Sequence, residues 1–391
     1  MKILSIGYLP KEVGGSYTTG IARVVYALSE QQIDGVQTFM YATNTKNSVA
    51  RKLCAYKNQY IGYSYKLGAI LLDVIFHPRR TIREWRFYKN NCFENPLRFE
   101  FFKVNIESAI RQVRPDLIHV HSALPATYFA NRKYGIPVLQ TLHGVMWDLE
   151  DGDNRAKKIY QATIPLVDYF TGLNQEVERK MLNLGIPKEK ITLIPNGVDS
   201  GKFYFSQDKR KEFREKYGVD DDTVVFMTVG LVIDRKGQFD FMQILESLDV
   251  KYQYWIFGNG PDFDKIKAYC DEHNLNDKVK LMGYVKDTDL YQFHSAADVY
   301  AHASTTEGQA LSEIEAYSTG LRVIVNKKIA DTVAGNSRED KATYYVMDFN
   351  DVDQDEALQW INNKPERRES RQNFDWHCIQ QRYVDLYRSL L

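Results

Sequence analysis

Short apolar runs alternate with amphipathic segments along most of the chain. Residues 2–8 (KILSIGY) and 116–122 (DLIHVHS) have the length of buried strands, whereas residues 18–31 (TTGIARVVYALSEQ) carry apolar positions at helical spacing. The same alternation starts again at residues 223–230 (TVVFMTVG) and continues to residues 320–326 (GLRVIVN). Strands that alternate with helices predict two α/β lobes, each with a parallel, doubly wound sheet.

The chain is long enough for two hydrophobic cores. At 391 residues it suits two domains of about 150–200 residues each. We expect an N-terminal lobe over residues 1–190, a C-terminal lobe over 191–373 and a last helix over 374–391. Residues 50–104 interrupt the first lobe with an insert rich in basic and aromatic side chains. The last helix can pack on either lobe through one apolar face, formed by Trp376, Ile379, Tyr383, Leu386 and Leu390.

Composition narrows the class of protein. Lys plus Arg and Asp plus Glu both number 51, so no overall field attracts nucleic acid, and any charged site is local. No run approaches the roughly 18–20 apolar residues of a membrane span, and the opening MKILSIGYLP reads as a strand, not a signal peptide. The four cysteines lack CxxC spacing, which argues against a zinc site or a disulfide framework. We therefore expect a cytoplasmic protein with reduced thiols.

Two loops of the N-terminal lobe carry candidate ligand-binding residues. Parallel sheets bind ligands outside the carboxyl ends of their strands, so each strand-to-helix loop is a candidate. After the first strand, Gly14, Gly15 or Gly20 lets backbone amides approach an anion at a helix start; the alternative is a glycine turn before a threonine N-cap. His143 follows a later strand and suits a hydroxyl or a phosphate, although a lone histidine is more often structural.

A basic pair marks the first loop of the C-terminal lobe. Arg235 and Lys236 precede Gly237 and a predicted helix. Two cations beside a helix N-terminus favour a diphosphate, because the side chains and the helix dipole act on the same anion. Basic pairs are also common on surfaces, so this loop alone does not define a site.

Two glutamates mark a later strand-to-helix turn. Residues 303–325 (ASTTEGQALSEIEAYSTGLRVIV) hold Glu307 and Glu315, for which one interpretation is a catalytic or ligand-holding role. The alternative is an S-x-x-E capping box, in which Ser312 caps the helix and Glu315 reaches back to it. No G-x-S-x-G, H-E-x-x-H, Walker or G-x-G-x-x-G motif is present, which removes several enzyme classes.

Taken together, these loops resemble the retaining glycosyltransferases of family 4, and the resemblance runs along nearly the whole chain. It implies the GT-B fold, in which two Rossmann-like lobes face a central cleft. Glu307 and Glu315 match the family's E-x7-E motif. The matching stretches come in the family's order, and they are RPDLIHVHS (114–122), GIPVLQTLHG (135–144), ITLIPNGVDSGKF (191–203), VGLVIDRKG (229–237), FGNGP (257–261), VKLMGYV (279–285) and TTEGQALSEIEAYSTG (305–320).

The resemblance implies a nucleotide diphospho-sugar donor, with a UDP-sugar as the first choice, held mainly by the C-terminal lobe. Lys236, helped by Arg235, would neutralise the diphosphate. Glu315 would accept hydrogen bonds from the ribose, and Glu307 and His143 would contact the transferred sugar. The other expected donor contacts are Gly14, Gly15, Gly20, Gly230, Tyr284, Val285, Gly308, Gln309, Ala310 and Leu311.

By the same resemblance, the chain transfers a hexose to a hydroxyl acceptor with retention of anomeric configuration. The acceptor is a lipid, a glycan or a protein in envelope, surface-polysaccharide or glycolipid synthesis. The leaving phosphate takes the acceptor proton, so neither a metal ion nor another cofactor is expected. The G-L-x-x-x-R-K-G form of the basic loop is similar to that of bacterial diacylglycerol glucosyltransferases.

Two departures from the family keep a second class open. Leu231 stands where the family usually has arginine, and Gly308 to Ala310 (GQA) replaces Gly-Phe-Gly. A donor-incompetent partner protein that binds glycan or a catalytic transferase is therefore the alternative. Sugar-nucleotide epimerisation, another chemistry of this fold, is disfavoured by the E-x7-E pattern.

The insert offers a separate surface. Residues 76–88 (FHPRRTIREWRFY) can lie on an anionic membrane, at the inner face of the cell membrane, with Trp85 and Phe87 in the lipid. The alternative is an ordinary surface helix or a protein interface. The side chains expected at lipid phosphates are Arg79, Arg80, Arg83 and Arg86.

Overall fold

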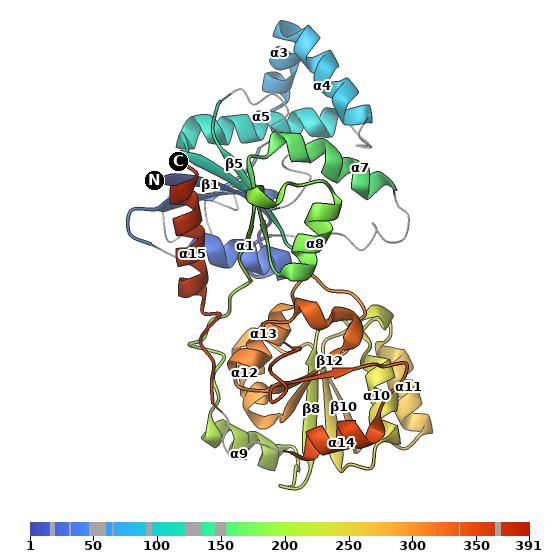
Figure 1. Cartoon of the computed structure of the whole chain (residues 1–391). Coiled ribbons are helices and arrows are strands. Elements are labelled where there is room, and N and C mark those ends of the chain that lie inside the picture. Colours follow the sequence, from blue (N-terminus) through green and yellow to red (C-terminus); the bar gives the residue numbers. More distant parts are fainter. Residues whose placement is uncertain are drawn as a thin grey trace. The chain divides into compact units, whose positions relative to one another are not determined.

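The structure, a computed structural model, describes residues 1–15, 20–30, 33–46, 60–64, 66–90, 96–121, 134–144, 154–335, 337–363 and 369–391. These residues form two compact units, Met1–Pro195 with His377–Leu391, and Asn196–Trp376. Each unit has its own parallel sheet with helices on both faces (Figure 1). The prediction of two doubly wound α/β lobes is therefore confirmed.

The first unit is built on a seven-stranded sheet with the order β3-β2-β1-β4-β5-β6-β7. Every pairing is parallel, and β1 places Leu4 beside Phe39 on one side and Ile118 on the other. Strands of such a sheet are covered on both faces, which explains the continuous apolar runs of the sequence. The strands are β1 (Lys2–Gly7), β2 (Gln37–Lys46), β3 (Tyr60–Tyr63), β4 (Leu117–Val120), β5 (Val138–Leu142), β6 (Tyr169–Gly172) and β7 (Ile191–Leu193).

Helices cover the two faces of this sheet with separate apolar clusters. Ile110, Tyr160 and Met181 pack against one face, and Val25 packs with Met40 against the other. The helices of the unit are α1 (Gly20–Glu30), α3 (Leu67–Phe76), α4 (Pro78–Asn90), α5 (Pro96–Val113), α7 (Asn154–Thr163), α8 (Gln175–Asn183) and α15 (Trp376–Ser389). None of the helices among the described residues is long and apolar enough to cross a membrane.

The C-terminal helix α15 packs on the first unit. The Tyr387 hydroxyl lies 2.8 Å from His119 Nδ1 on β4, and Gln380 Nε2 donates to the Leu28 carbonyl at 2.9 Å. The chain therefore leaves this unit at Pro195 and returns to it at His377.

The residues of the predicted apolar face of α15 are buried to different degrees. Ile379 and Tyr383 are buried as expected, but Leu386 and Leu390 are only half-buried. Tyr387 is buried in their place, because its hydroxyl reaches His119 beneath the sheet. Apolar spacing alone does not reveal a tyrosine whose hydroxyl has a buried partner.

The second unit is built on a six-stranded sheet with the order β10-β9-β8-β11-β12-β13. Its pairings are parallel throughout. The strands are β8 (Val224–Val229), β9 (Tyr252–Phe257), β10 (Val279–Gly283), β11 (Val299–His302), β12 (Arg322–Asn326) and β13 (Tyr344–Met347). The helices are α9 (Gln207–Lys216), α10 (Gln238–Ser247), α11 (Phe263–Glu272), α12 (Asp287–Ala296), α13 (Leu311–Ser318) and α14 (Gln354–Asn362).

Alternate residues of β8 point to opposite faces of this sheet. Phe226 packs with Phe241 of α10, whereas Met227 packs on the side that holds Phe293 of α12 and Ala316 of α13. The helix after β8 and the helix after β11 therefore cover opposite faces. Between these two strands the strand order reverses, and the loops that follow them separate.

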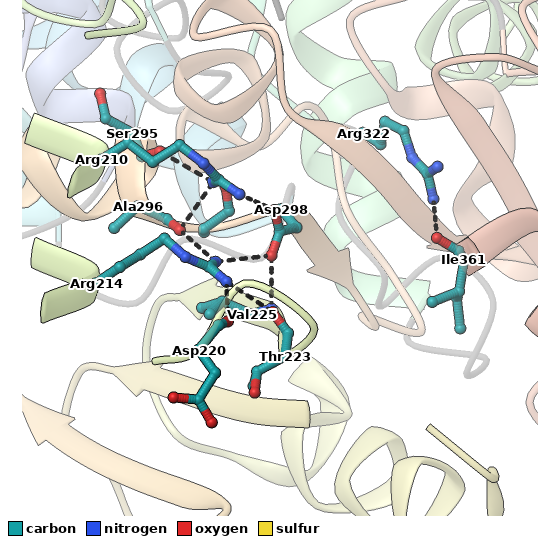
Figure 2. A network of polar contacts seen from close by, with 11 residues as sticks. Arg210, Arg214, Asp220, Thr223, Val225, Ser295, Ala296, Asp298, Arg322 and Ile361 are labelled. Atoms are coloured by element: carbon teal, nitrogen blue, oxygen red, sulfur yellow. Dashed lines mark hydrogen bonds and ion pairs between the residues drawn. The ribbon is translucent and has the colours of Figure 1, made fainter. Parts of the chain in front are cut away.

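A buried carboxylate ties α9 to the sheet of the second unit (Figure 2). Asp298 accepts hydrogen bonds from Arg210 NH2 at 2.6 Å, Arg214 NH1 at 3.1 Å and the Val225 amide at 2.8 Å. Burial opposes the charge, but both guanidinium groups hold the pKa of Asp298 below its usual value. Arg214 also donates to the Thr223 carbonyl at 2.8 Å, so the network fixes the segment that enters β8.

We predict that Asp298→Ala lowers the free energy of unfolding of the second unit by about 3–5 kcal/mol at pH 7, because two largely buried guanidinium groups lose their counter-ion. Since the folded pKa is depressed, this contribution is present above the unfolded pKa of about 3.9 and is lost as pH falls through the folded pKa. Urea titration followed by hydrogen exchange in residues 224–229 measures the change.

Asp222→Ala is the matched control for this prediction. The Asp222 side chain is 70% exposed and pairs with Lys251 at 2.8 Å on the surface. Its loss is expected to cost below about 1 kcal/mol. Equal effects of the two substitutions would show that the Asp298 network does not hold α9 in place.

Candidate functional site

Two loops of the second unit meet where its strand order reverses. After β8 the chain forms a short 3-10 turn (Asp234–Lys236) before α10, and after β11 it passes through residues 303–310 to α13. Lys236 Nζ forms an ion pair with Glu307 Oε1, and Arg235 NH1 lies 3.9 Å from the same oxygen. The structure thus brings together three of the residues predicted to hold a donor.

Glu307 is ionised in this setting. Its side chain is only 14% exposed; burial opposes the charge, but Lys236 holds the pKa of Glu307 below its usual value. Ser304 Oγ donates a further hydrogen bond to Glu307 Oε1 at 3.1 Å. Lys236 and Arg235 thus place two cations beside this one carboxylate, and the local excess of positive charge suits an anionic ligand.

Backbone contacts hold the two loops together. The Thr305 amide donates to the Arg235 carbonyl at 2.9 Å. Gly237, which begins α10, has φ 66°, and a Cβ at this position would lie 2.3 Å from the Ala303 carbonyl oxygen. Both the left-handed conformation and the close approach of the loops require glycine here.

Gln309, a predicted donor contact, uses its side chain within the second unit. Its Oε1 accepts a hydrogen bond from the Asn196 amide at 2.7 Å, and its carbonyl accepts one from Asn196 Nδ2 at 3.3 Å. Asn196 lies in the I-P-N-G-V-D stretch that begins this unit. These bonds satisfy a buried amide, and they position the loop that carries Glu307.

The capping-box interpretation of α13 is wrong. The helix begins at Leu311, its N-cap is Ala310, and no side chain caps it. Ser312 lies inside the first turn, where its hydroxyl is 2.8 Å from the Tyr300 hydroxyl. Glu315 lies farther along the helix and is 5% exposed, so a capping role no longer accounts for this carboxylate.

The loops after β9 and β10 extend the same edge of the sheet. The Gly258 amide donates to the Gly283 carbonyl at 2.7 Å, and a Cβ on Gly258 would lie 1.8 Å from the Gly230 carbonyl oxygen. Exposed Tyr284 and half-buried Val285 follow β10 directly. Gly230 and these two residues therefore follow the carboxyl ends of β8 and β10, on the same edge of the sheet as Lys236 and Glu307. The predicted backbone contacts Gly308, Ala310 and Leu311 lie in the Glu307 loop and at the start of α13.

His302 is a candidate that sequence reasoning missed. It ends β11, is 3% exposed, and has a pKa lowered to about 4 by burial, so its ring is neutral at pH 7. The charges of Glu307 and Lys236 both act on it. Within the described residues its Nε2 has no hydrogen-bond partner. A histidine at the carboxyl end of an otherwise apolar strand is the signal that marks such a position.

In the first unit, Gly14 and Gly15 form a tight turn after β1. Gly14 has φ 85°, and the Gly15 amide donates to the Pro10 carbonyl at 2.9 Å. A Cβ on Gly15 would lie 1.8 Å from the Leu9 carbonyl oxygen, so only glycine fits. Gly20 is the first residue of α1, and the threonines considered as its N-cap lie outside the described residues.

His143 belongs to a row of three histidines at the carboxyl ends of β4 and β5. Its Nε2 lies 3.1 Å from His121 Nδ1, and the His121 ring lies 4.0 Å from that of His119. His119 Nε2 is 2.7 Å from Thr141 Oγ1. Burial lowers the pKa of His143 to about 4 and that of His119 to about 3, so both rings are neutral at pH 7. His143 Nδ1 makes no hydrogen bond within the described part of the chain.

Among the described residues, Asp73, Glu84 and Glu100 are the three acidic side chains close enough together to hold a metal ion. Lys103 Nζ lies 2.8, 2.6 and 2.6 Å from their carboxylates, respectively. An ammonium group therefore occupies the position that a cation would take. This group of residues lies on α3, α4 and α5.

Comparison with known protein families identifies the class. The family model described as "Glycosyltransferase Family 4" matches residues 18–202, and the model described as "Glycosyl transferases group 1" matches residues 209–374. The two matches correspond to the two sheets of the structure. The chain belongs to the family 4 glycosyltransferases, as its E-x7-E and I-P-N-G-V-D stretches predict.

The names of two curated relatives include a lipid. The alpha-monoglucosyldiacylglycerol synthase of Acholeplasma laidlawii is 25% identical over 246 residues, which cover 55% of this chain and 60% of that protein. The UDP-Gal:alpha-D-GlcNAc-diphosphoundecaprenol alpha-1,3-galactosyltransferase of Escherichia coli is 25% identical over 270 residues, which cover 64% of this chain and 67% of that protein. The chain thus matches about 60% of the first relative's own length.

Solved structures share the fold along the whole chain. The Anabaena protein HepE, in complex with UDP and glucose, has a TM-score of 0.73 at 16% identity, and 100% of each chain is covered. Sucrose-phosphate synthase from Thermosynechococcus elongatus has a TM-score of 0.70 at 18% identity, with 100% of this chain and 98% of that chain covered. At these identities the likeness concerns the fold, and it confirms the predicted GT-B fold.

We predict that Gly237→Ala destabilises the protein more than Gly218→Ala. Both glycines have positive φ, 66° and 62°, so alanine incurs a similar cost of about 1 kcal/mol for the left-handed conformation. Only Gly237 faces a carbonyl oxygen at 2.3 Å, whereas Gly218 has nothing within 4 Å. We expect losses of about 2–4 kcal/mol and about 1 kcal/mol, respectively, by chemical denaturation. Equal losses would contradict the close approach of the Lys236 and Glu307 loops.

Proposed function

We propose that this protein is a retaining glycosyltransferase that moves a hexose from a UDP-sugar to a hydroxyl acceptor. The observation that carries the proposal is the meeting of Lys236, Arg235 and Glu307 where the second sheet reverses its strand order. Doubly wound sheets bind nucleotides at this edge. The cations suit a diphosphate, and the carboxylate suits sugar hydroxyls. The UDP and glucose in the HepE complex support the choice of donor.

In the proposed reaction, the bond between the anomeric carbon and the diphosphate oxygen breaks while the acceptor hydroxyl attacks from the same face. Negative charge then grows on the diphosphate, where Lys236 and Arg235 stabilise it. A leaving phosphate oxygen takes the acceptor proton as the new carbon–oxygen bond forms. The products are UDP and the glycosylated acceptor, and no side chain has to act as a base.

The remaining roles follow from the chemistry of each side chain. We assign Glu307 to hydroxyls of the transferred sugar and Glu315 to the ribose, because a carboxylate side chain has two acceptor oxygens for hydroxyl groups. We assign Tyr284 and Val285 to the base. The neutral ring of His143 offers Nδ1 to a substrate hydroxyl, and its contact with His121 fixes the ring orientation.

We propose a lipid or a lipid-linked glycan as the acceptor, with the enzyme at the cytoplasmic face of a membrane. The names of the Acholeplasma and Escherichia relatives, which include a monoglucosyldiacylglycerol and a GlcNAc-diphosphoundecaprenol, support this choice. Acceptor selectivity depends on loops that differ between proteins of one fold. The acceptor and the glycosidic linkage therefore have to be measured.

A panel of UDP-, GDP- and ADP-sugars tests the function, with nucleotide release as the readout. We expect release from a UDP-sugar. Lys236→Ala should lower turnover by about 100-fold or more, because it removes charge stabilisation of the leaving group. Glu315→Ala should weaken UDP binding by about 10- to 100-fold through loss of charged hydrogen bonds. Lys267→Ala, an exposed lysine on α11, should change neither quantity.

Failure to bind any nucleotide sugar would overturn the enzyme proposal. It would favour the alternative, a donor-incompetent partner protein. Two observations support this alternative. Leu231 is 50% exposed where a cation is usual in the family, and Gln309 uses its side chain on Asn196.

We further predict that turnover persists in the presence of EDTA, since Lys236 and Arg235 supply the positive charge that a metal ion supplies elsewhere. The measurement compares UDP release before and after chelation. Loss of turnover that magnesium restores would contradict the prediction. Proton NMR of the first product anomer tests retention in the same samples.

A further inference from the structure

The helix α3 presents an apolar surface that the proposed reaction does not use. Five of its large side chains are 55–70% exposed: Leu67, Leu71, Leu72, Ile75 and Phe76. Their spacing puts them on one side of the helix. Proteins that act alone in water rarely expose a contiguous group of this kind, so the surface indicates an interaction.

A buried charge cluster holds the opposite side of the same helix. Lys103 of α5 bonds to Asp73 of α3, Glu84 of α4 and Glu100 of α5, at 2.6–2.8 Å. Arg80 of α4 pairs with Asp73 and lies 3.6 Å from Glu84. Burial opposes the charge of Lys103, but its three carboxylate partners raise the pKa of that group, so Lys103 stays charged. These contacts orient both helices on α5.

The outer side of α4 is cationic. Four exposed side chains lie on the side of α4 away from Glu84, as their helical spacing shows: Arg79, Ile82, Arg83 and Arg86. The two acidic residues of α3 and α4 are both in the buried cluster. The exposed charged side chains of these two helices are therefore all basic, although the whole chain has no net charge.

The predicted membrane contact over residues 76–88 is thereby corrected in two respects. Trp85 Nε1 donates to Glu100 Oε1 at 3.2 Å, and Arg80 pairs with Asp73, so neither side chain is directed outward. The main apolar surface lies on α3, which shares only Phe76 with the predicted stretch. The pattern suggested Trp85 because an aromatic side chain among arginines is typical of interfacial helices.

We propose that the outer sides of α3 and α4 form a docking surface for an anionic lipid bilayer. The apolar side chains of α3 enter the boundary between headgroups and acyl chains, and the arginines of α4 meet lipid phosphates. Charge complementarity selects this occupant, because a second copy of the chain would set the same arginines against one another. A bilayer offers an apolar layer directly beside negative charge, which is the combination that these two helices present.

This surface would hold the enzyme beside a lipid acceptor. In that one respect the docking proposal rests on the proposed function. Bilayer binding itself requires no donor and no turnover. The two proposals therefore fail separately: vesicle binding measured without nucleotide tests the surface, and UDP release measured without vesicles tests the enzyme.

Sedimentation of the full chain with vesicles tests the docking surface. We expect binding to vesicles of phosphatidylcholine with phosphatidylglycerol, little binding to phosphatidylcholine alone, and weaker binding as salt rises. Leu71→Ser with Ile75→Ser should reduce binding at least tenfold. Arg79→Gln with Arg83→Gln should reduce it about 30-fold at low salt, roughly fivefold per cation.

Matched substitutions elsewhere provide the controls. Leu182→Ser removes another exposed apolar side chain, on α8, and Lys211→Gln with Lys267→Gln removes two exposed cations. Both should leave vesicle binding unchanged. Thermal denaturation of every variant should match that of the wild-type protein, because the altered side chains are on the outer surface.

Three results would overturn the proposal. One is vesicle binding that the α3 and α4 substitutions do not alter, which would place any membrane contact elsewhere. Another is a concentration-dependent dimer that Leu71→Ser with Ile75→Ser dissociates, which would identify a second copy as the occupant. The third is displacement from vesicles by millimolar glycerol phosphate alone, which would show that the arginines bind free phosphate and not a lipid surface.

Discussion

The reversal of strand order between β8 and β11 is the constraint on which the candidate site depends. Parallel strands end at one edge of a sheet, and at the reversal the helices that follow depart to opposite faces. Lys236 comes from one of the separating loops and Glu307 from the other, 71 positions later. Their ion pair is therefore a consequence of topology. Glycine at position 237 then sets how closely the two loops approach.

Two glutamates in the stretch from Glu307 to Glu315 acquire different properties from their surroundings. Glu307 faces Lys236, which holds its pKa low. Glu313 is buried, which raises its pKa to about 7, and it accepts hydrogen bonds from the Ala334 amide and the Tyr344 hydroxyl, each at 2.9 Å. Glu313 thus serves the packing of α13. The spacing of carboxylates in a sequence does not separate these roles, because a pKa depends on partners that come from distant strands.

Much of the fold could be predicted from the sequence, and the limits have physical causes. Strand and helix alternation predicted both sheets, because buried parallel strands form nearly continuous apolar runs. The pattern did not single out β2, where Asn44 interrupts the run and bonds to the Leu9 backbone at 2.8 and 2.9 Å. In the site, the family motifs located Lys236 and Glu307. They missed His302 and the contact of Gln309 with Asn196, since both depend on tertiary neighbours.

The Asp298 cluster of the second unit and the Lys103 cluster of the first have the same effect. Each determines the orientation of a helix that apolar packing alone would not determine. In the second unit Asp298 holds α9 through two arginines. In the first, α3 has apolar residues around most of its circumference, so burying its leucines against α5 would be the simple outcome. Asp73 opposes this packing, because its largely buried carboxylate pairs with Lys103 and Arg80 on the side of α3 that faces α5. The apolar face of α3 is therefore exposed as a result of specific ion pairing.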